Sequence, residues 1–214
     1  MKLYSYFRSS AAYRVRIALN LKGLKYDYVP VNLLEREQKS AEYLSDNPQG
    51  LVPALMTDDG TVIGQSVAIM EWLEETHPQP ALLPTDSLQR AAMRSMVNNI
   101  TCDIHPILNM AVTNYLQDQL SADEAQIFEW YRTWMERGFQ AVETALAKSS
   151  GDFCFGDAPS MADCVLVPQV FNADRFKLPM EAYPVIRRVV EHCKQQEAFR
   201  AAHPLQQIDA PKQL

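Results

Sequence analysis

The sequence predicts an α/β domain followed by an all-helical domain. Up to about residue 80, short strand-like apolar runs alternate with amphipathic helical segments, a pattern typical of α/β structure. Beyond that point the apolar residues recur only at helical spacing. Between the two parts, residues 78–84 hold three prolines in seven positions, which favours a stiff linker. We therefore place the domains at 1–80 and 86–214, with a linker at 81–85.

The first domain is expected to alternate strands and helices. In chain order we predict a strand at 3–6, a helix at 13–22, a strand near 26–31, a loop with a short helix at 35–44, strands at 54–56 and 61–63, and a helix from 66 to the proline at 78. Val15, Ala18 and Leu19 give the first helix its apolar face. Asp58-Asp59-Gly60 favours a hairpin turn between the last two strands.

The second domain contains long apolar stripes at helical spacing. They comprise Met93, Met96, Val97, Ile100 and Ile104; Ile127, Tyr131, Trp134, Val142 and Leu146; and Tyr183, Ile186, Val190 and Cys193. Such stripes usually form the core of a helical domain. Ser160 and Asp163 have the spacing of a capping box at the start of a further helix. With no histidine nearby in sequence, this pair is interpreted as structural rather than catalytic.

Composition excludes several classes of protein. The 214 residues are 47% hydrophobic and include 8 Phe, 9 Tyr and 3 Trp, which argues against disorder. The net charge of −6 argues against general nucleic-acid binding. No apolar run approaches the ~20 residues of a membrane span. The N-terminus also lacks a basic region followed by a long apolar stretch, so we expect no secretory signal and a cytoplasmic protein.

The four cysteines give no sign of a disulfide or a metal centre. Cys102, Cys154, Cys164 and Cys193 are widely spaced, and none forms a C-x-x-C pair. The four histidines show no H-x-x-x-H spacing. We expect ordinary reduced thiols, largely buried, and no metal site.

A possible anion site lies where the first strand ends and the first helix begins. Arg8, Ser9 and Ser10 occupy this junction. A helix N-terminus carries unpaired N–H groups and positive partial charge, which suit a thiolate. The alternative is that one serine is only a helix cap.

Two further segments carry possible binding groups. Val52-Pro53 precedes a strand, where a proline is tolerated because it lacks an N–H for the ladder. If the bond is cis, the backbone N–H and C=O of Val52 can point outward and pair with an extended peptide, but local pattern alone does not favour a cis bond. Gln65-Ser66 opens a helix with no acidic residue before Glu71, so its free N–H groups could bind a carboxylate. The alternative for Ser66 is again a plain cap.

Taken in order, these motifs resemble a cytosolic glutathione transferase, and within that family the zeta class. The stretch from Ser5 to Gly23 is similar to the zeta pattern of Ser-Ser-Cys followed by an aromatic residue and Arg-Val-Arg-Ile-Ala-Leu. The resemblance covers essentially the whole chain. The other matching motifs are Asn47-Pro48, Val52-Pro53, Gln65-Ser66, Met161-Ala162-Asp163, Leu166 to Val170, Arg175-Phe176 and His203-Pro204.

The resemblance implies a thioredoxin-like domain, a helical domain, a homodimer, glutathione as cofactor and maleylacetoacetate isomerase activity on a small dicarboxylate. The glutathione-binding residues that it implies are Ser10, Gln38, Val52, Pro53, Gln65, Ser66, His105 and Asn109. The catalytic residues are Ser9, Ser10 and Arg8, and the substrate-binding residues are Arg8, His105 and Arg175. Gln38 would meet the glycine end, Val52 would pair with the cysteinyl backbone beside a cis Pro53, and Gln65 and Ser66 would hold the γ-glutamyl carboxylate.

The sequence departs from the zeta pattern in one position and varies in another. Ala11 stands where the family has a cysteine, so chemistry that needs a protein thiol there is in doubt. His105 lies in Asp-Ile-His-Pro, a version also seen in maleylpyruvate isomerases, which makes maleylpyruvate an alternative substrate.

Two more functions stay open for a chain with this resemblance. One is conjugation or dehalogenation of small α-halo acids, and the other is glutathione binding without catalysis. The pair Arg8 and Arg175 favours an acidic substrate for isomerisation over general conjugation. The intact serines at positions 9 and 10 argue against a non-catalytic protein.

Overall fold

The computed structural model describes residues 1–212 and divides into two compact units. The first unit combines residues 1–82 with residues 194–214, and the second spans residues 83–193. The sequence predicts a helical domain from 86 to 214. In the structure, the residues from Lys194 onward group with the first unit instead. Each unit is described by itself.

The first unit is built on a four-stranded mixed sheet in the order β2-β1-β3-β4. Its elements are β1 (Lys2–Ser5), α1 (Ser10–Leu21), β2 (Asp27–Pro30), η1 (Glu37–Lys39), α2 (Ala41–Asp46), β3 (Ala54–Met56), β4 (Val62–Gly64), α3 (Ser66–Thr76), α9 (Glu197–Ala202) and η4 (Pro204–Gln206). β1 runs parallel to β2 and antiparallel to β3, and β4 is antiparallel to β3. Leu3 at the centre lies opposite Tyr28 and Leu55. This arrangement is the thioredoxin-like half that was expected.

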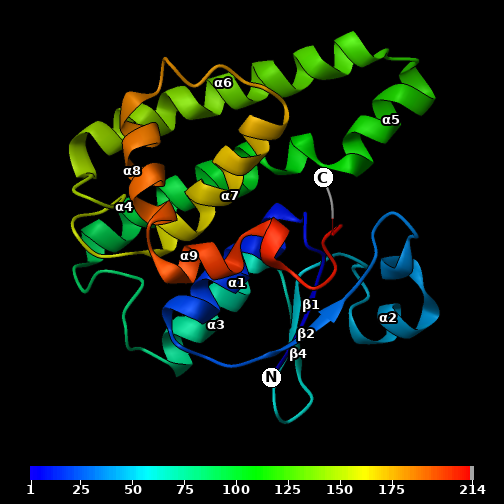
Figure 1. Ribbon diagram of the computed structural model, residues 1–214, viewed down its shortest axis with the longest axis horizontal. Helices are drawn as coiled ribbons and strands as arrows, with labels where there is room; N and C mark the ends of the chain where they lie inside the picture. The colour runs from blue at the N-terminus through cyan, green and yellow to red at the C-terminus, as the bar shows by residue number, and fades with distance from the viewer. Residues whose placement is uncertain (213–214) are drawn as a thin grey trace. The chain divides into compact units, whose positions relative to one another are not determined.

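Helices cover both sides of this sheet. Figure 1 shows α1 and α3 on one side and α2 on the other. Leu3, Ile17, Leu55 and Ile69 are fully buried in the resulting core. The helix α1 starts three residues earlier than predicted, because the Ser9 side chain accepts a hydrogen bond from the Ala12 N–H and caps it.

The C-terminal segment packs on the first unit, which sequence periodicity did not predict. Figure 1 shows α9 beside α1, and the two helices are in contact. The buried Arg16 of α1 donates from Nε to the Ala202 carbonyl at 3.0 Å, and Asn20 donates to the Ala198 carbonyl at 3.0 Å. Side chains of α1 thus fix the backbone of α9, a long-range pairing that local pattern cannot reveal.

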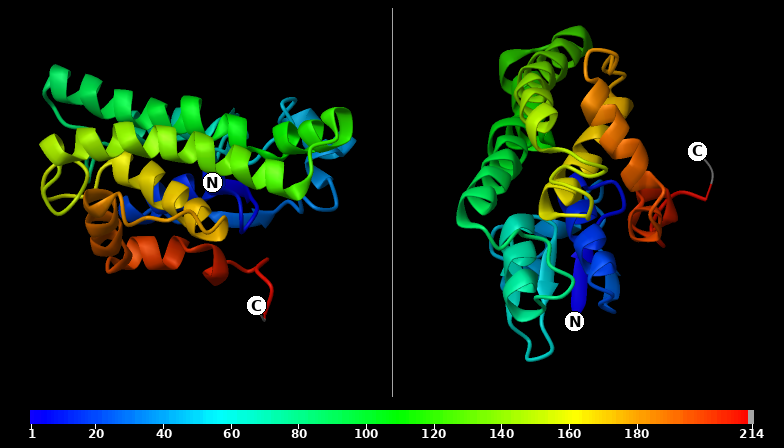
Figure 2. Two further views of the ribbon diagram at one scale, coloured as in Figure 1. Left: turned by 90° about the horizontal axis from the view of Figure 1, so that it is seen from above. Right: turned by 90° about the vertical axis from the view of Figure 1, so that its left-hand side faces the viewer.

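The second unit is helical throughout its regular elements. They are α4 (Ser87–Asn98), η2 (Asn99–Ile104), η3 (Pro106–Leu108), α5 (Met110–Leu120), α6 (Glu124–Ser149), α7 (Met161–Arg175) and α8 (Pro184–Lys194). α4 continues into η2, which is a π-helical segment, and α7 packs against both. Figure 2 shows the long helix α6 running beside this group. Within residues 1–212, none of the helices combines the length and the apolar character that a membrane span requires.

Two local features explain the packing of these helices. Gly138 lets η2 approach α6, since a Cβ there would lie 2.2 Å from Ile104. The predicted capping box of α7 is confirmed: the Ser160 N–H donates to the Asp163 carboxylate at 2.8 Å. Asp163 is fully buried and also accepts from the Cys154 N–H at 2.8 Å, so the box ties α7 to the preceding loop.

Candidate functional site

The start of α1 places two serines in different roles. Ser9 is the N-cap, its Oγ 3.2 Å from the Ala12 nitrogen, which confirms the capping interpretation for this residue. Ser10 is the first helical residue and is 5% exposed. The first turn holds no acidic side chain, so the positive end of the helix is not neutralised. An anion beside Ser10 would therefore gain from both the hydroxyl and the helix terminus.

Arg8 lies in the turn between β1 and α1 and is partly exposed. Within the described chain, its guanidinium makes no hydrogen bond or ion pair. It is therefore available to an acidic ligand, as expected for a residue that receives a carboxylate.

The Val52-Pro53 segment leaves its backbone polar groups open. The peptide bond between them is cis, as predicted. No hydrogen bond among residues 1–212 uses the N–H or C=O of Val52, and the pairing of β3 with β1 begins only at Ala54. The preceding carbonyl, of Leu51, is fixed by the Tyr43 hydroxyl at 2.6 Å and the Asn47 amide at 2.8 Å. Val52 is thus held rigidly at the sheet end with both groups available to a peptide.

Gln65 and Ser66 open α3 in an unusual conformation. Gln65 has φ +66° and ψ +119°, a region that residues other than glycine rarely occupy and that often marks a functional site. Its amide donates to Gln49 Oε1 at 2.7 Å. Ser66 is the first helical residue rather than the cap, and its Oγ accepts from Nη1 of the buried Arg14 at 3.2 Å. The plain-cap alternative therefore does not describe Ser66.

Arg14 adds a positive charge at the start of α3, a role that was not predicted from the sequence. It lies one turn into α1 and is 2% exposed, yet its guanidinium reaches the first residue of α3. The first turn of α3 also lacks an acidic side chain. A buried cation and a helix N-terminus together favour a carboxylate at this point. Only the fold reveals this pairing, since Arg14 and Ser66 are 52 positions apart.

Gln38 lies in η1, close to the loop that precedes Val52. Its Oε1 is buried without a hydrogen-bond partner in the described part of the chain. Gly50, at φ +62°, lies against this segment: a Cβ there would be 2.8 Å from Lys39 Nζ and 2.9 Å from the Gln38 carbonyl. An acceptor and a cation thus flank the loop where a peptide ligand's glycine end is expected.

The remaining predicted residues belong to the second unit. Asn109 caps α5 by accepting from the Val112 N–H at 3.1 Å. Arg175 ends α7, is exposed, and donates to Asn172 at 3.0 Å. His105 joins η2 to η3, with its Nδ1 buried.

Contacts inside the second unit link the end of α7, beside Arg175, to Asn109 at the start of α5. The ring of Phe176, next to Arg175, stacks on Tyr131 with centroids 3.8 Å apart. The Tyr131 hydroxyl reaches Thr113 at 3.5 Å, and the Thr113 N–H donates to the Asn109 carbonyl at 3.2 Å. Arg175 and Asn109 were predicted from the sequence, but the stacking of Phe176 on Tyr131 that connects their segments was not.

Two of the protein's four thiols are poor candidates for a nucleophile. Cys154, Cys164 and Cys193 are buried, as expected, whereas Cys102 is exposed. Burial, reinforced by the nearby Asp163, raises the pKa of Cys154 and Cys193 well above the ordinary value. Both therefore stay protonated at neutral pH, which makes these two thiols poor nucleophiles.

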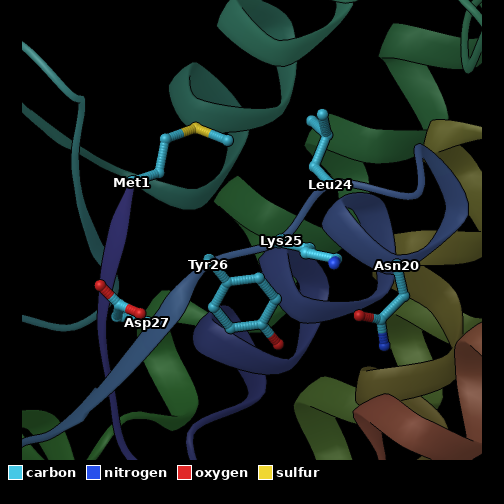
Figure 3. A pocket seen from close by; sticks show the side chains of 6 residues that line it. All are labelled: Met1, Asn20, Leu24, Lys25, Tyr26 and Asp27. Atoms are coloured by element: carbon cyan, nitrogen blue, oxygen red, sulfur yellow. The ribbon is translucent and has the colours of Figure 1, made fainter.

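A surface hollow of about 540 Å³ lies apart from these residues. Figure 3 shows the side chains that line it, which are Met1, Asn20, Leu24, Lys25, Tyr26 and Asp27. It contains none of the residues predicted for the site. Its position at the opposite end of α1 from Ser10 gives it no part in the chemistry considered below.

The sequence and structure match known proteins along the whole chain. Residues 8–76 match the model of the glutathione S-transferase N-terminal domain, and residues 124–192 match that of the C-terminal domain. The maleylacetoacetate isomerase of Pseudomonas aeruginosa is 48% identical over 213 residues, covering 99% of each chain.

Two solved structures are also similar. One is a maleyl pyruvate isomerase described as a bacterial zeta-class glutathione S-transferase, with 46% identity and a TM-score of 0.96 over 99% of this chain and 100% of that one. The other is a maleylacetoacetate isomerase from Methylobacterium extorquens AM1 with bound malonate and glutathione, with 38% identity and a TM-score of 0.95 over the same shares. These matches confirm the resemblance to the zeta class that the sequence motifs indicated.

Proposed function

Because the chain belongs to the glutathione S-transferase family, we propose that it is a glutathione-dependent cis–trans isomerase that converts maleylacetoacetate to fumarylacetoacetate. The observation that carries this proposal is the geometry of the first unit. There the starts of α1 and α3 are joined by Arg14, and Val52 keeps both backbone groups available. Such a site fits a peptide that has a carboxylate at one end and a thiol in the middle.

The residues of the first unit fit glutathione group by group. Ser66, Gln65 and the start of α3 would hold the γ-glutamyl carboxylate, with Arg14 supplying positive charge behind them. The backbone of Val52 would pair with the cysteinyl residue. Gln38, whose Oε1 is buried and unpartnered within residues 1–212, would meet the glycine end. From the second unit, we assign Asn109 and His105 to the same ligand.

The residues around the sulfur position explain how the site promotes the reaction. When bound, glutathione supplies a thiolate that adds reversibly to the cis double bond and leaves again after rotation. Ser10 and the N-terminus of α1 stabilise the sulfur anion and so lower the thiol pKa. Arg8 and Arg175 receive the carboxylates of the substrate and the negative charge that develops on its carbonyl oxygen. Ser9 keeps the helix start in place by capping it.

Three observations favour an acidic substrate over a general electrophile. Arg8 is available in the described chain, Arg175 is exposed on the second unit, and a similar protein holds malonate together with glutathione. An apolar electrophile would need neither arginine. Maleylpyruvate is the second candidate, favoured by the 46% identity to a maleyl pyruvate isomerase and by His105. We also include in the proposal a cytoplasmic location and a homodimer, as the family resemblance implies.

A substrate comparison tests this function. The purified protein, with glutathione present, should be given maleylacetoacetate and maleylpyruvate separately while the change in absorbance is followed. We expect turnover of both acids, with maleylacetoacetate giving the higher kcat/KM. A higher kcat/KM for maleylpyruvate would assign the second candidate instead. Conjugation of an α-halo acid without isomerisation of either acid would refute the isomerase.

A further inference from the structure

The loop that carries Arg8 and Ser9 is held by side chains from distant parts of the chain. It connects β1 to α1, and a turn closes it, with the Ser9 N–H donating to the Tyr6 carbonyl at 2.9 Å. The Phe7 carbonyl accepts from Nη2 of the buried Arg16 at 3.0 Å. The Phe7 N–H donates to Asp209 Oδ2 at 2.9 Å, across 202 positions of sequence. Both backbone groups of the residue before Arg8 are therefore fixed by side chains.

Asp209 is itself oriented by a second strand of the sheet. Its other oxygen, Oδ1, accepts from the Tyr28 hydroxyl at 2.7 Å, and Tyr28 belongs to β2. Burial, with the Asp209 hydrogen bond contributing, raises the pKa of Tyr28 above its ordinary value. The phenol therefore remains a donor throughout the working pH range. Asp209 thus bridges β2 and the loop Phe7–Ser9, with one carboxylate oxygen bonded to each.

The segment around Asp209 is anchored and also packs on the site. The Gln207 amide donates to the Ala201 and His203 carbonyls, each at 2.9 Å, which holds the segment after α9 in place. Next to Asp209, Ala210 packs against an apolar cluster that contains Phe7 and Val52. The C-terminal segment therefore packs against the apolar cluster that includes Phe7, beside Arg8, and Val52.

We propose that Asp209 is a positioning residue for glutathione activation, which sets the loop Phe7–Ser9 so that the start of α1 faces the sulfur and Arg8 faces the substrate. This inference rests on the proposed function, in which Ser10 and the start of α1 act on the glutathione thiol, Arg8 binds the substrate and Ser9 caps the helix. Asp209 does not touch the ligand in this account. It acts through the Phe7 N–H, and Tyr28 keeps its carboxylate in the correct orientation.

Substitution of Asp209 should separate activation from binding. We expect Asp209→Ala to raise the pKa of the bound glutathione thiol, measured by the ultraviolet absorbance of the thiolate against pH. The kcat should fall on the order of 10-fold, within the roughly 100-fold that a misplacement of about 1 Å can cost. The Kd for glutathione by calorimetry should change little, because Gln65 and Ser66 are not moved. Asp209→Asn, which keeps an acceptor for Phe7, should recover part of kcat.

Two further variants keep the test decisive. Tyr28→Phe keeps the ring and removes the hydroxyl that donates to Asp209 and also interacts with Ser5. It should shift the thiol pKa in the same direction by less, and it serves if Asp209→Ala does not fold. Glu197→Ala removes another C-terminal carboxylate, one that pairs with Arg200 at the surface, and should change nothing. The proposal is wrong if folded Asp209→Ala keeps the wild-type thiol pKa and kcat, or if Glu197→Ala shows the same shift.

The wild-type protein separates this inference from the proposed function. If it binds glutathione with a lowered thiol pKa but isomerises neither acid, the proposed reaction fails while Asp209 is still tested by the thiol pKa. If the bound thiol has the pKa of free glutathione, both proposals fail.

Discussion

Two neighbouring serines at one helix start have different environments, and this difference predicts different phenotypes. Ser9 is occupied as the N-cap of α1, whereas Ser10 is the first helical residue. Loss of a hydrogen bond to a charged group costs about 1.5–3 kcal/mol. Ser10→Ala should therefore raise the apparent thiol pKa and lower turnover at neutral pH by roughly 10- to 150-fold. The measurement is the pH–rate profile with saturating glutathione.

Ser9→Ala is the matched control for this prediction. Loss of the cap should lower the free energy of unfolding by about 1 kcal/mol with little effect on the thiol pKa. If Ser9→Ala shifts the pH–rate profile and Ser10→Ala does not, the hydroxyl has been assigned to the wrong serine. If neither shifts it, the helix terminus or an arginine activates the thiol.

The start of α3 makes a separate prediction about binding. Gln65 and Ser66 are assigned to the γ-glutamyl carboxylate, so the double variant Gln65→Ala with Ser66→Ala should weaken glutathione affinity by roughly 10-fold or more. Calorimetry measures the change. Because Ser10 is untouched, the pKa of the thiol at saturation should stay close to the wild-type value. Wild-type affinity in the double variant would show that the carboxylate binds elsewhere.

At the scale of elements, the sequence predicted those features that depend on residues close together in the chain. The hairpin β3–β4, the helix after Gln65 and the capping box of α7 were all predicted, because each depends on residues a few positions apart. The packing of α9 on α1 was not, since it depends on Arg16 reaching a carbonyl 186 positions away. For the same reason the sequence indicated Ser66 but not Arg14 behind it. Long-range polar pairs leave no periodic signal.

The capping box of α7 should be a major contributor to stability. Asp163 is fully buried and accepts from the N–H groups of Cys154 and Ser160, so its loss leaves buried donors unsatisfied. Asp163→Ala should cost about 3 kcal/mol, or roughly 6–12 °C in Tm for a chain of this size. Ser160→Ala should cost only about 1 kcal/mol, as for an ordinary cap. Equal Tm values for the two variants in thermal denaturation would contradict this account of Asp163.

For the whole molecule, the family resemblance predicts a two-fold dimer, the commonest symmetry among oligomers. Light scattering at assay concentration should give twice the 24.3 kDa of a single chain. A stable species with the mass of one chain would contradict the prediction.

The central claim is that the thiolate of bound glutathione, and no protein thiol, drives the isomerisation. The claim rests on Ala11 at the family's cysteine position, and the raised pKa values of the buried Cys154 and Cys193 argue against those two thiols. The most direct test compares initial rates with maleylacetoacetate in the presence of glutathione, of S-methylglutathione and of neither. S-methylglutathione keeps the peptide groups but has no ionisable thiol. We predict turnover only in the mixture that contains glutathione, and none with S-methylglutathione or with neither. An equal rate in all three mixtures would contradict the account.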